Sequence, residues 1–325
     1  MQRVISVTKS IKELYDGDEF VGFYVIKEME AKLTNGSVPK DYLDLVLADS
    51  SGHISAKYWE ASKTDIETFY PMCLVKVQGV VQVYREKLQV KVIRIRKATE
   101  RDGVSITDFI RTAPVGPDEL LPIIEQAATS ITHEEIKSIV AYCYGKVKDK
   151  MNASPAAKSR HHAYYGGLAY HIARMLELGE FICRQRPFLN SDLIKAGIIL
   201  HDIAKPAEMV SEYGMVTDYS NQGKLIGHIS MAANWIAEAA VKLGIGLESN
   251  IVLALQHLVL SHHNLGEWGS PVQPQLPEAV ALHYIDAMDA KLQMVEDTLA
   301  TTAAGEEWTP AIRGLENKPI YRLTL

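Results

Sequence analysis

Cysteine is scarce in this chain. Its 325 residues include three, Cys73, Cys143 and Cys183, and their scattered positions match neither a disulfide framework nor a thiolate metal site. Such usage suits a reduced compartment, so all three are interpreted as structural. The first residues, Met1-Gln-Arg-Val-Ile-Ser, also lack the apolar stretch of a signal peptide. The expected location is therefore the cytoplasm.

Long hydrophobic runs and an excess of basic charge are also missing. No apolar stretch reaches the roughly 20 residues that a membrane helix needs, so no membrane partner is expected. Lys and Arg number 34 against 40 Asp and Glu, a formal net charge of −6, which argues against a surface coated for duplex DNA. A local basic strip is compatible with that sum. The length allows two domains.

The first part of the chain predicts an all-β domain over residues 1–98. Five segments are rich in β-branched and aromatic residues or alternate apolar with polar ones: 19–26, 42–47, 53–59, 73–83 and 88–96. A short helix over 61–70 separates the third from the fourth, and 84–87 joins the last two as a hairpin. Five strands with a helix in that place predict an OB-fold barrel, which often binds single-stranded nucleic acid.

Basic charge is concentrated in residues 73–101, with eight Lys or Arg against two acidic residues. Arg94 belongs to this strip. Tyr84 and other aromatic residues such as Phe23 offer platforms on which bases can stack. The same pattern also fits the solvated face of an edge hairpin with aromatic residues in the core. Both interpretations stay open, with Tyr84 and Arg94 as candidate contacts to a strand.

Residues 99–159 are predicted to connect two domains. The stretch 99–116 is polar and marked by proline and glycine. Two helices follow, at about 117–127 and 131–149. Thr132, with Glu135 three residues on, predicts a capping box at the start of the second helix. Beyond residue 160 the pattern is helical to about 303, and 304–325 are expected to form an irregular tail.

The helical part holds most of the histidines, nine of 11 lying between His161 and His283. Five successive predicted helices place His or Asp on or beside their apolar faces: His171, His201-Asp202, His228, His262-His263 and His283 with Asp286. A lone buried histidine such as His171 is ordinarily a satisfied core residue. Unpaired buried imidazoles and carboxylates are costly, however, so their convergence in one bundle predicts bound metal ions.

The order of these residues resembles the HD superfamily of metal-dependent phosphohydrolases, in the branch with extra histidines that holds two metals. The matching positions are His171, His201-Asp202-x-x-Lys205, His228, His262-His263 and Asp286. Longer stretches resemble the YhaM-type 3′→5′ exoribonucleases, at 161–171, 223–229, 260–263, 267–271 and 283–291. That family also carries an N-terminal OB-fold, so the resemblance covers nearly the whole chain. It implies an all-α HD-domain bundle over 160–303.

The resemblance also implies a ligand set for two divalent ions, bridged by Asp202. The first ion is held by His171, His201, Asp202 and Asp286, and the second by His228, His262 and His263. Imidazole and carboxylate ligands suit Mn²⁺, Fe²⁺, Co²⁺ or Zn²⁺, with manganese expected first. The implied reaction is hydrolysis of single-stranded RNA, with single-stranded DNA as a further candidate, from the 3′ end. A metal-activated water releases nucleoside 5′-monophosphates.

Several residues beside the ligands are candidates for catalysis or substrate binding. Lys205 is placed to contact a phosphate oxygen beside the catalytic Asp202, or else complements a helix dipole. His161 and His162 are candidates for contacts to phosphate or sugar, or for protonating the leaving 3′-oxygen, or lie on the surface. Trp268 either stacks on a terminal base or packs in the core. Three further residues are expected to support ligands or the core: His257, His283 and Asp289.

Two positions depart from the pattern of the family. Ala204 stands where the His-Asp motif usually has glycine, and Asn264 stands where glycine usually follows the His-His pair. Neither change removes a ligand, and asparagine tolerates the left-handed conformation that glycine often adopts after a helix. The departures therefore bear on substrate preference more than on metal binding.

Two other functions stay open. Two-metal HD proteins also hydrolyse cyclic dinucleotides or nucleotides, although the stretch after His262-His263 lacks the Gly-Tyr-Pro signature of the cyclic-dinucleotide branch. A non-catalytic nucleic-acid-binding protein with an OB-fold is the second alternative, and the full ligand set argues against it. The oligomeric state is not readable from the sequence.

Overall fold

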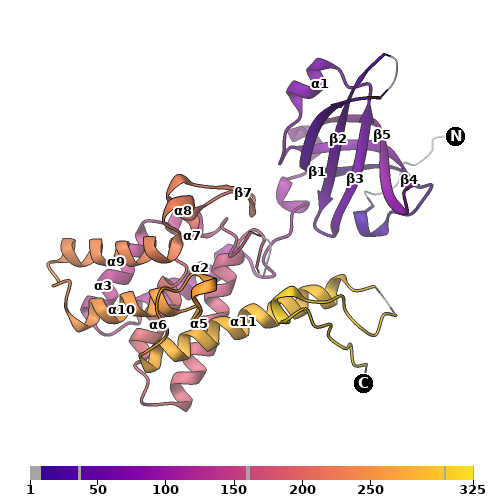
Figure 1. Cartoon of the computed structure of the whole chain (residues 1–325). Coiled ribbons are helices and arrows are strands. Elements are labelled where there is room, and N and C mark those ends of the chain that lie inside the picture. Colours follow the sequence, from indigo (N-terminus) through magenta and orange to yellow (C-terminus); the bar gives the residue numbers. More distant parts are fainter. Residues whose placement is uncertain (1–8, 36–37, 159–161, 304, 325) are drawn as a thin grey trace. The chain divides into compact units, whose positions relative to one another are not determined.

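The structure is a computed structural model that describes residues 9–35, 38–158, 162–303 and 305–324. The chain divides into two compact units, Met1–Thr112 and Ala113–Leu325 (Figure 1). The first is a β-barrel, and the second is built mainly from helices. The predicted fold class, an all-β domain followed by a helical one, is confirmed.

Five strands close the barrel of the first unit in the order β1-β2-β3-β5-β4. The elements are β1 (Glu19–Leu33), β2 (Asp41–Asp49), β3 (Gly52–Trp59), α1 (Lys63–Thr68), β4 (Leu74–Tyr84) and β5 (Lys87–Lys97). Side chains alternate between interior and surface, so that Leu43, Leu45 and Leu47 of β2 are fully buried. β3 and β5 pair in parallel, whereas the other neighbours are antiparallel. The predicted OB-fold order is confirmed.

β4 and β5 form a long hairpin whose last pair is Tyr84 with Lys87. The two residues between them, Arg85 and Glu86, have positive φ angles of 50° and 65°. These are the angles of a tight two-residue hairpin turn, whose twist matches that of the flanking strands. The hairpin predicted across 84–87 is confirmed.

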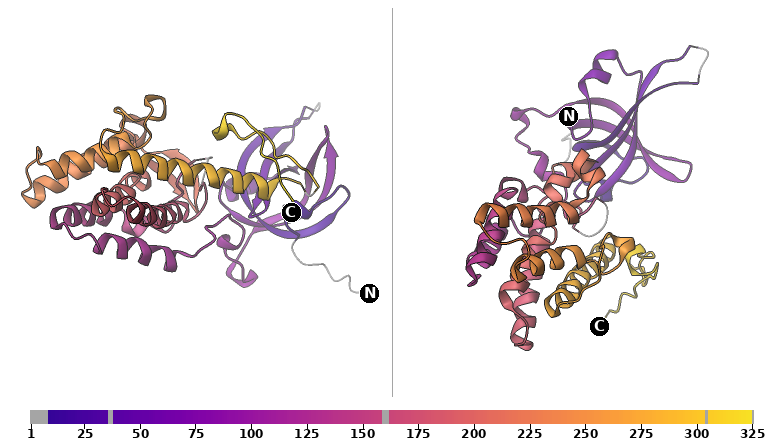
Figure 2. Two further views of the ribbon diagram at one scale, coloured as in Figure 1. Left: turned by 90° about the horizontal axis from the view of Figure 1, so that it is seen from below. Right: turned by 60° about the vertical axis from the view of Figure 1, so that its left-hand side comes forward.

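The helices of the second unit pack around one hydrophobic core (Figure 2). They are α2 (Pro117–Thr129), α3 (Glu134–Gly145), α4 (Lys148–Met151), α5 (Gly167–Gln185), α6 (Ser191–Leu200), α7 (Lys205–Glu208), α8 (Asn221–Leu225), α9 (His228–Leu243), α10 (Asn250–Ser261) and α11 (Pro277–Thr301). Ile124 of α2 and Ile139 of α3 belong to this core. The segment that the sequence predicted to connect the domains is therefore partly built into the helical unit. No helix of the described residues is long and apolar enough to cross a membrane.

A small two-stranded sheet interrupts the helices expected over 160–303. β6 (Met209–Glu212) and β7 (Met215–Tyr219) pair in antiparallel fashion across Tyr213 and Gly214. Both turn residues have positive φ, and a Cβ on Gly214 would come within 2.1 Å of the backbone nitrogen of Tyr165. Glycine therefore lets the turn lie directly against the chain that leads into α5.

Two chain segments make contacts with distant residues that the sequence did not predict. The predicted capping box is wrong, since α3 begins at Glu134 and the hydroxyl of Thr132 donates to Asp192 at 2.7 Å. The tail folds back on α11, where the guanidinium of Arg322 donates to the carbonyl oxygen of Leu299 at 2.6 Å. It therefore caps the last turn of that helix.

Gly79 marks a register shift between β4 and β5, and a Cβ there would lie 2.7 Å from Cγ1 of Val90 and 3.0 Å from the carbonyl oxygen of Lys91. Because both atoms are held by the barrel, we expect Gly79→Ala to lower its free energy of unfolding by about 1–3 kcal/mol. Hydrogen exchange of the full chain, followed over β4 and β5, measures the change. The control is Gly52→Ala, whose Cβ would lie 3.9 Å from its nearest neighbour. Equal exchange in both variants would contradict the prediction.

Candidate metal centre

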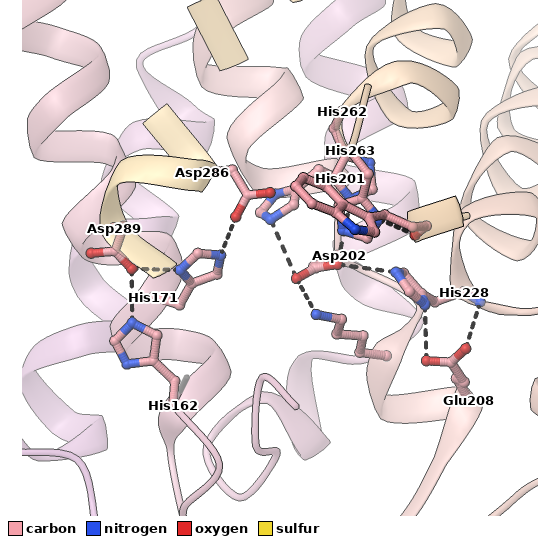
Figure 3. A network of polar contacts seen from close by, with 12 residues as sticks. His162, His171, His201, Asp202, Glu208, His228, His262, His263, Asp286 and Asp289 are labelled. Atoms are coloured by element: carbon pink, nitrogen blue, oxygen red, sulfur yellow. Dashed lines mark hydrogen bonds and ion pairs between the residues drawn. The ribbon is translucent and has the colours of Figure 1, made fainter. Parts of the chain in front are cut away.

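Five segments of the helical unit bring the seven predicted ligands into one cluster (Figure 3). Each ligand comes from an element of the bundle or from the residues directly after it: His171 on α5, His201 and Asp202 after α6, His228 at the start of α9, His262 and His263 after α10, and Asp286 on α11. Ligand atoms of His171, His201 and Asp202 lie within 4.8 Å of one another, as do those of His228, His262 and His263. Asp286 approaches Nε2 of His171 at 3.3 Å. Two groups of donors thus lie side by side.

α6 delivers the central pair of this cluster. Asn190 caps the helix by accepting from the backbone nitrogens of Asp192 and Leu193. The apolar residues that follow, among them Ile194 and Ile198, are buried in the core. The helix therefore ends deep inside the unit and leaves the next two residues, His201 and Asp202, buried.

The five histidines share one arrangement, in which Nδ1 bonds to a fixed acceptor. The acceptors are Asp289 for His171 (2.7 Å), the Ile198 carbonyl for His201 (2.8 Å), Glu208 for His228 (2.9 Å), the Val259 carbonyl for His262 (2.7 Å) and the Trp268 carbonyl for His263 (2.6 Å). A carbonyl oxygen only accepts, so the ring nitrogen facing it must carry the proton. The other nitrogen, Nε2, then keeps the lone pair that a metal ion needs.

Four buried atoms at the centre make no hydrogen bond to any described residue. They are Nε2 of His201, His228 and His262, and Oδ1 of Asp202. Burying such atoms without partners is costly, and buried polar groups in folded proteins are nearly always paired. Divalent cations bound in the two donor groups would satisfy all four. Their nitrogen and oxygen chemistry therefore fits the metal that the sequence predicted.

Asp202 lies between the two groups of donors. Its Oδ2 is 3.3 Å from Nε2 of His201, whereas its Oδ1 is 3.3 Å from Nε2 of His228 and 4.0 Å from Nε2 of His262. One carboxylate oxygen thus faces each group. Burial by itself would raise the pKa of Asp202, but Lys205 and His201 outweigh it and hold this pKa well below its usual value. The carboxylate is therefore charged.

Lys205 is part of the cluster. It is 8% exposed, and its ammonium donates to Oδ2 of Asp202 at 2.5 Å. It is the first residue of α7, five positions beyond the end of α6. The ion pair with Asp202 favours a role in the cluster, and the alternative, in which Lys205 complements the dipole of the helix before it, stays a prediction.

Known proteins resemble this chain over nearly its whole length. The HD domain family model matches residues 168–291. The chain is 39% identical over 316 residues to the 3'-5' exoribonuclease YhaM of Shouchella clausii, with 97% of each chain covered. It is 39% identical over 313 residues to that of Bacillus subtilis, covering 96% of this chain and 97% of the relative. The chain belongs to the YhaM family.

A solved structure also resembles part of this YhaM-family chain. The second OB-fold domain of replication protein A from Methanococcus maripaludis covers 28% of this chain and 94% of its own, at 17% identity and a TM-score of 0.25.

The two departures from the YhaM-family pattern cause no strain at the cluster. Ala204 is buried with φ −88° and ψ −3°, in the right-handed region that any residue adopts. Asn264 has φ +64°, so the left-handed conformation expected after His262-His263 is confirmed. Both positions thus keep the backbone that glycine would give.

The histidines predicted to act beside the cluster lie in different places. His162 is fully buried, with Nε2 donating to Asp289 at 2.7 Å and Nδ1 lying 2.7 Å from the hydroxyl of Tyr164. His162 therefore supports the carboxylate of Asp289, which orients His171, and does not face a nucleic-acid substrate. His161 lies outside the described residues. His283 bonds through Nδ1 to the carbonyl oxygen of His262 at 2.8 Å, which supports that ligand from α11.

Three of the predicted substrate contacts, Trp268, Tyr84 and Arg94, are exposed. Trp268 is 50% exposed on a short 3-10 helix (Gly266–Trp268), so core packing, its other interpretation, is wrong. Its main-chain carbonyl oxygen accepts the bond from His263, which holds the backbone of Trp268 beside the cluster. On the barrel, Tyr84 is 52% exposed beneath the guanidinium of Arg85, and Arg94 is exposed on β5.

Glu208 is the functional candidate that sequence reasoning missed. It is buried at the end of α7, and its carboxylate bonds to His228, twenty positions further along the chain. The sequence offers one weak signal, an acidic residue six positions after Asp202 in a mostly apolar segment. Only the fold brings it behind a ligand.

Divalent metal is expected to stabilise the helical unit, because it satisfies the four unpartnered atoms. Mn²⁺ at a hundred times its dissociation constant adds about 2.7 kcal/mol to the free energy of unfolding. Thermal unfolding with Mn²⁺ and with excess chelator measures the effect. Asp202→Ala should abolish the shift. The prediction would be contradicted if the unaltered protein had the same melting temperature with Mn²⁺ as with chelator.

Proposed function

We propose that this protein is a metal-dependent 3′→5′ exoribonuclease that hydrolyses single-stranded RNA to nucleoside 5′-monophosphates. The observation that carries the proposal is the buried Asp202 with one oxygen toward each of two histidine groups whose Nε2 atoms face it. Relatives that span nearly the whole chain carry the name 3'-5' exoribonuclease YhaM. Single-stranded DNA is a second candidate substrate.

The proposed ligand set divides over two ions. The first set is His171, His201, Asp202 and Asp286, and the second is His228, His262 and His263, with Asp202 shared. Manganese is the first candidate, and iron, cobalt and zinc suit the same donors. Bound ions of this kind supply an activated water and draw charge from phosphoryl oxygens. Burial and the neighbouring rings hold the pKa of His262 well below its usual value, so that ring is neutral and ready to bind a cation.

Lys205 is proposed to contact the substrate phosphate. Its ammonium is buried and already lies at the carboxylate that both ion sets share. A cation in that position attracts a non-bridging phosphate oxygen and stabilises the charge that develops there during hydrolysis. Its ion pair with Asp202 also keeps the flexible side chain aimed at the cluster before substrate arrives.

The barrel is proposed to hold the RNA strand. Tyr84 offers an exposed ring, and Arg94 adds positive charge on β5. Aromatic stacking with a basic groove is the usual means of binding single strands without sequence preference. Binding and hydrolysis would then reside in different units, which makes them separable by substitution.

Asp202→Ala should abolish hydrolysis while leaving RNA affinity largely unchanged, because the substitution removes the shared ligand and leaves the barrel intact. A 5′-labelled single-stranded RNA with Mn²⁺ gives a ladder shortened from its 3′ end when the enzyme is active, and filter binding gives the affinity. The control is Asp218→Ala, an exposed aspartate paired with Lys224 in the same unit.

Parallel reactions with single-stranded DNA and a cyclic dinucleotide separate the candidate substrates. Turnover of the cyclic dinucleotide without any RNA ladder would contradict the exoribonuclease proposal. A ladder that persists in Asp202→Ala would contradict the role of the cluster.

Trp268 is proposed to stack on the terminal base. Its indole is half exposed, and its main-chain carbonyl oxygen bonds to a candidate ligand, His263. Stacking is worth about 1–3 kcal/mol per base, so Trp268→Ala should raise KM for RNA by roughly 5- to 150-fold. Trp268→Phe should restore most of the loss. Trp308, 54% exposed on the tail, provides the control. Equal KM values for Trp268→Ala and Trp308→Ala would refute the stacking role.

A further inference from the structure

Glu208 holds His228 with both oxygens of its carboxylate. Oε1 accepts from the backbone nitrogen of His228 at 3.0 Å, and Oε2 lies 2.9 Å from Nδ1 of the same residue. Figure 3 shows the carboxylate on the side of the ring away from Asp202. One side chain thus fixes both the main chain and the ring of a candidate ligand.

The start of α9 needs a partner from elsewhere. Gly227 occupies the capping position with φ 77° and ψ 154°, a conformation that is essentially restricted to glycine. Glycine has no side chain to bond to the first backbone N–H groups of the helix. Glu208 supplies this bond, and an anion is favoured at the N-terminus of a helix.

The backbone of Glu208 is itself held by two neighbouring residues. Its carbonyl oxygen accepts from the backbone nitrogen of Ser220 at 2.8 Å. Gly223 of α8 lies so close that a Cβ on it would come within 2.4 Å of the same carbonyl oxygen. The β6–β7 hairpin, which joins α7 to α8, returns the chain to this contact. The carboxylate therefore has little freedom to leave His228.

The carboxylate determines which nitrogen of His228 carries a proton. An ionised carboxylate only accepts, so it places the proton on Nδ1 and leaves the Nε2 lone pair toward Asp202, 3.3 Å away. His262 and His263 of the same group obtain this orientation from backbone carbonyls. His228 is therefore the member of the second group whose orientation depends on a side chain.

We infer that Glu208 is a positioning residue that sets the tautomer of His228 and, through it, the affinity of the second ion. The inference rests on the proposed metal centre and adds to it a residue that does not bind metal. Partners of this kind orient the ring and raise the basicity of the ligand, and their loss typically costs 10- to 100-fold in metal affinity.

Glu208→Gln tests the inference without removing a ligand. The amide oxygen still accepts from the backbone nitrogen of His228, whereas the amide nitrogen donates to Nδ1. That bond requires the lone pair on Nδ1 and moves the ring proton to Nε2, where it faces Asp202. We expect Mn²⁺ titration of the metal-free full chain to show the second ion bound 10- to 100-fold more weakly, with the first unchanged.

A second readout is independent of metal and of activity. Long-range ¹⁵N–¹H spectra of histidine-labelled, metal-free protein report which nitrogen of a neutral imidazole carries the proton. They are recorded at a pH high enough to leave His228 neutral, because Asp202 and Glu208 raise its pKa against the effect of burial. His228 should show a protonated Nδ1 in the unaltered protein and a protonated Nε2 in Glu208→Gln. A purely structural role for Glu208 would change stability and leave this pattern as it was.

Two further variants complete the test. Glu238→Gln removes the charge of a glutamate on α9 that accepts from Tyr142 at 2.6 Å and Lys146 at 2.8 Å. Its two Mn²⁺ affinities should equal those of the unaltered protein. Gly223→Ala keeps the carboxylate but displaces the backbone that carries it. It should weaken the second ion as well, and it makes the same test where Glu208→Gln fails to fold.

Two Mn²⁺ ions bound by Glu208→Gln with unaltered affinity, or a proton retained on Nδ1, would overturn the inference. Binding of no Mn²⁺ by the unaltered protein would overturn the metal centre together with the inference. Two bound ions with no RNA hydrolysis would contradict the proposed function alone and leave the role of Glu208 supported, so the failures are distinguishable.

Discussion

The helical unit depends on one constraint, the burial of a charged carboxylate among imidazoles. Asp202 is almost fully buried, and burial opposes its charge. The ammonium of Lys205 and the rings of His201 and His228 lie close to the carboxylate and offset that cost. A metal cation bound by Nε2 of the two rings would offset it further. α6 and α10 end, and α9 begins, where these groups meet.

Close packing of the helices fixes the positions of these groups relative to one another. Gly197 lets α6 approach its neighbours, since a Cβ there would lie 3.1 Å from Leu282 of α11 and 3.3 Å from Leu258 of α10. Gly179 of α5 has the same effect, because its Cβ would lie 2.6 Å from Ile198 of α6. The four helices that carry or precede most of the ligands thus touch through small residues. Tight packing of this kind leaves little room for the ligands to shift.

Much of the architecture could be predicted from local patterns. All five strands of the barrel were identified either by their β-branched and aromatic residues or by alternation of apolar and polar residues, which follows from the burial of one face of a strand. Helical spacing placed His171 and Asp286 on inward faces, and the structure brings them within 3.3 Å of one another. Periodicity could do this because each of these side chains follows the burial of its own element.

What escaped prediction depends on contacts between distant segments. Thr132 has the sequence of a capping box, yet its hydroxyl bonds to Asp192 from another helix. His162 precedes the first ligand helix and was expected either to contact substrate or to lie on the surface, but it is buried and bonded to Asp289. Glu208 reaches His228 only after a hairpin that the helical pattern did not reveal. In each case the partner lies too far along the chain for a local pattern to identify it.

The arrangement of the two donor groups also explains why Asp202 is the central ligand of the site. His171, His201 and Asp286 form one group, His262 and its companions form the other, and only Asp202 directs an oxygen to each. The donor arrangement therefore fits the proposed pair of ions. Anomalous diffraction from crystals of the Mn²⁺-loaded protein tests this most directly. The account predicts two manganese peaks, one in each donor group with Asp202 between them, and a single peak, or none at Asp202, would contradict it.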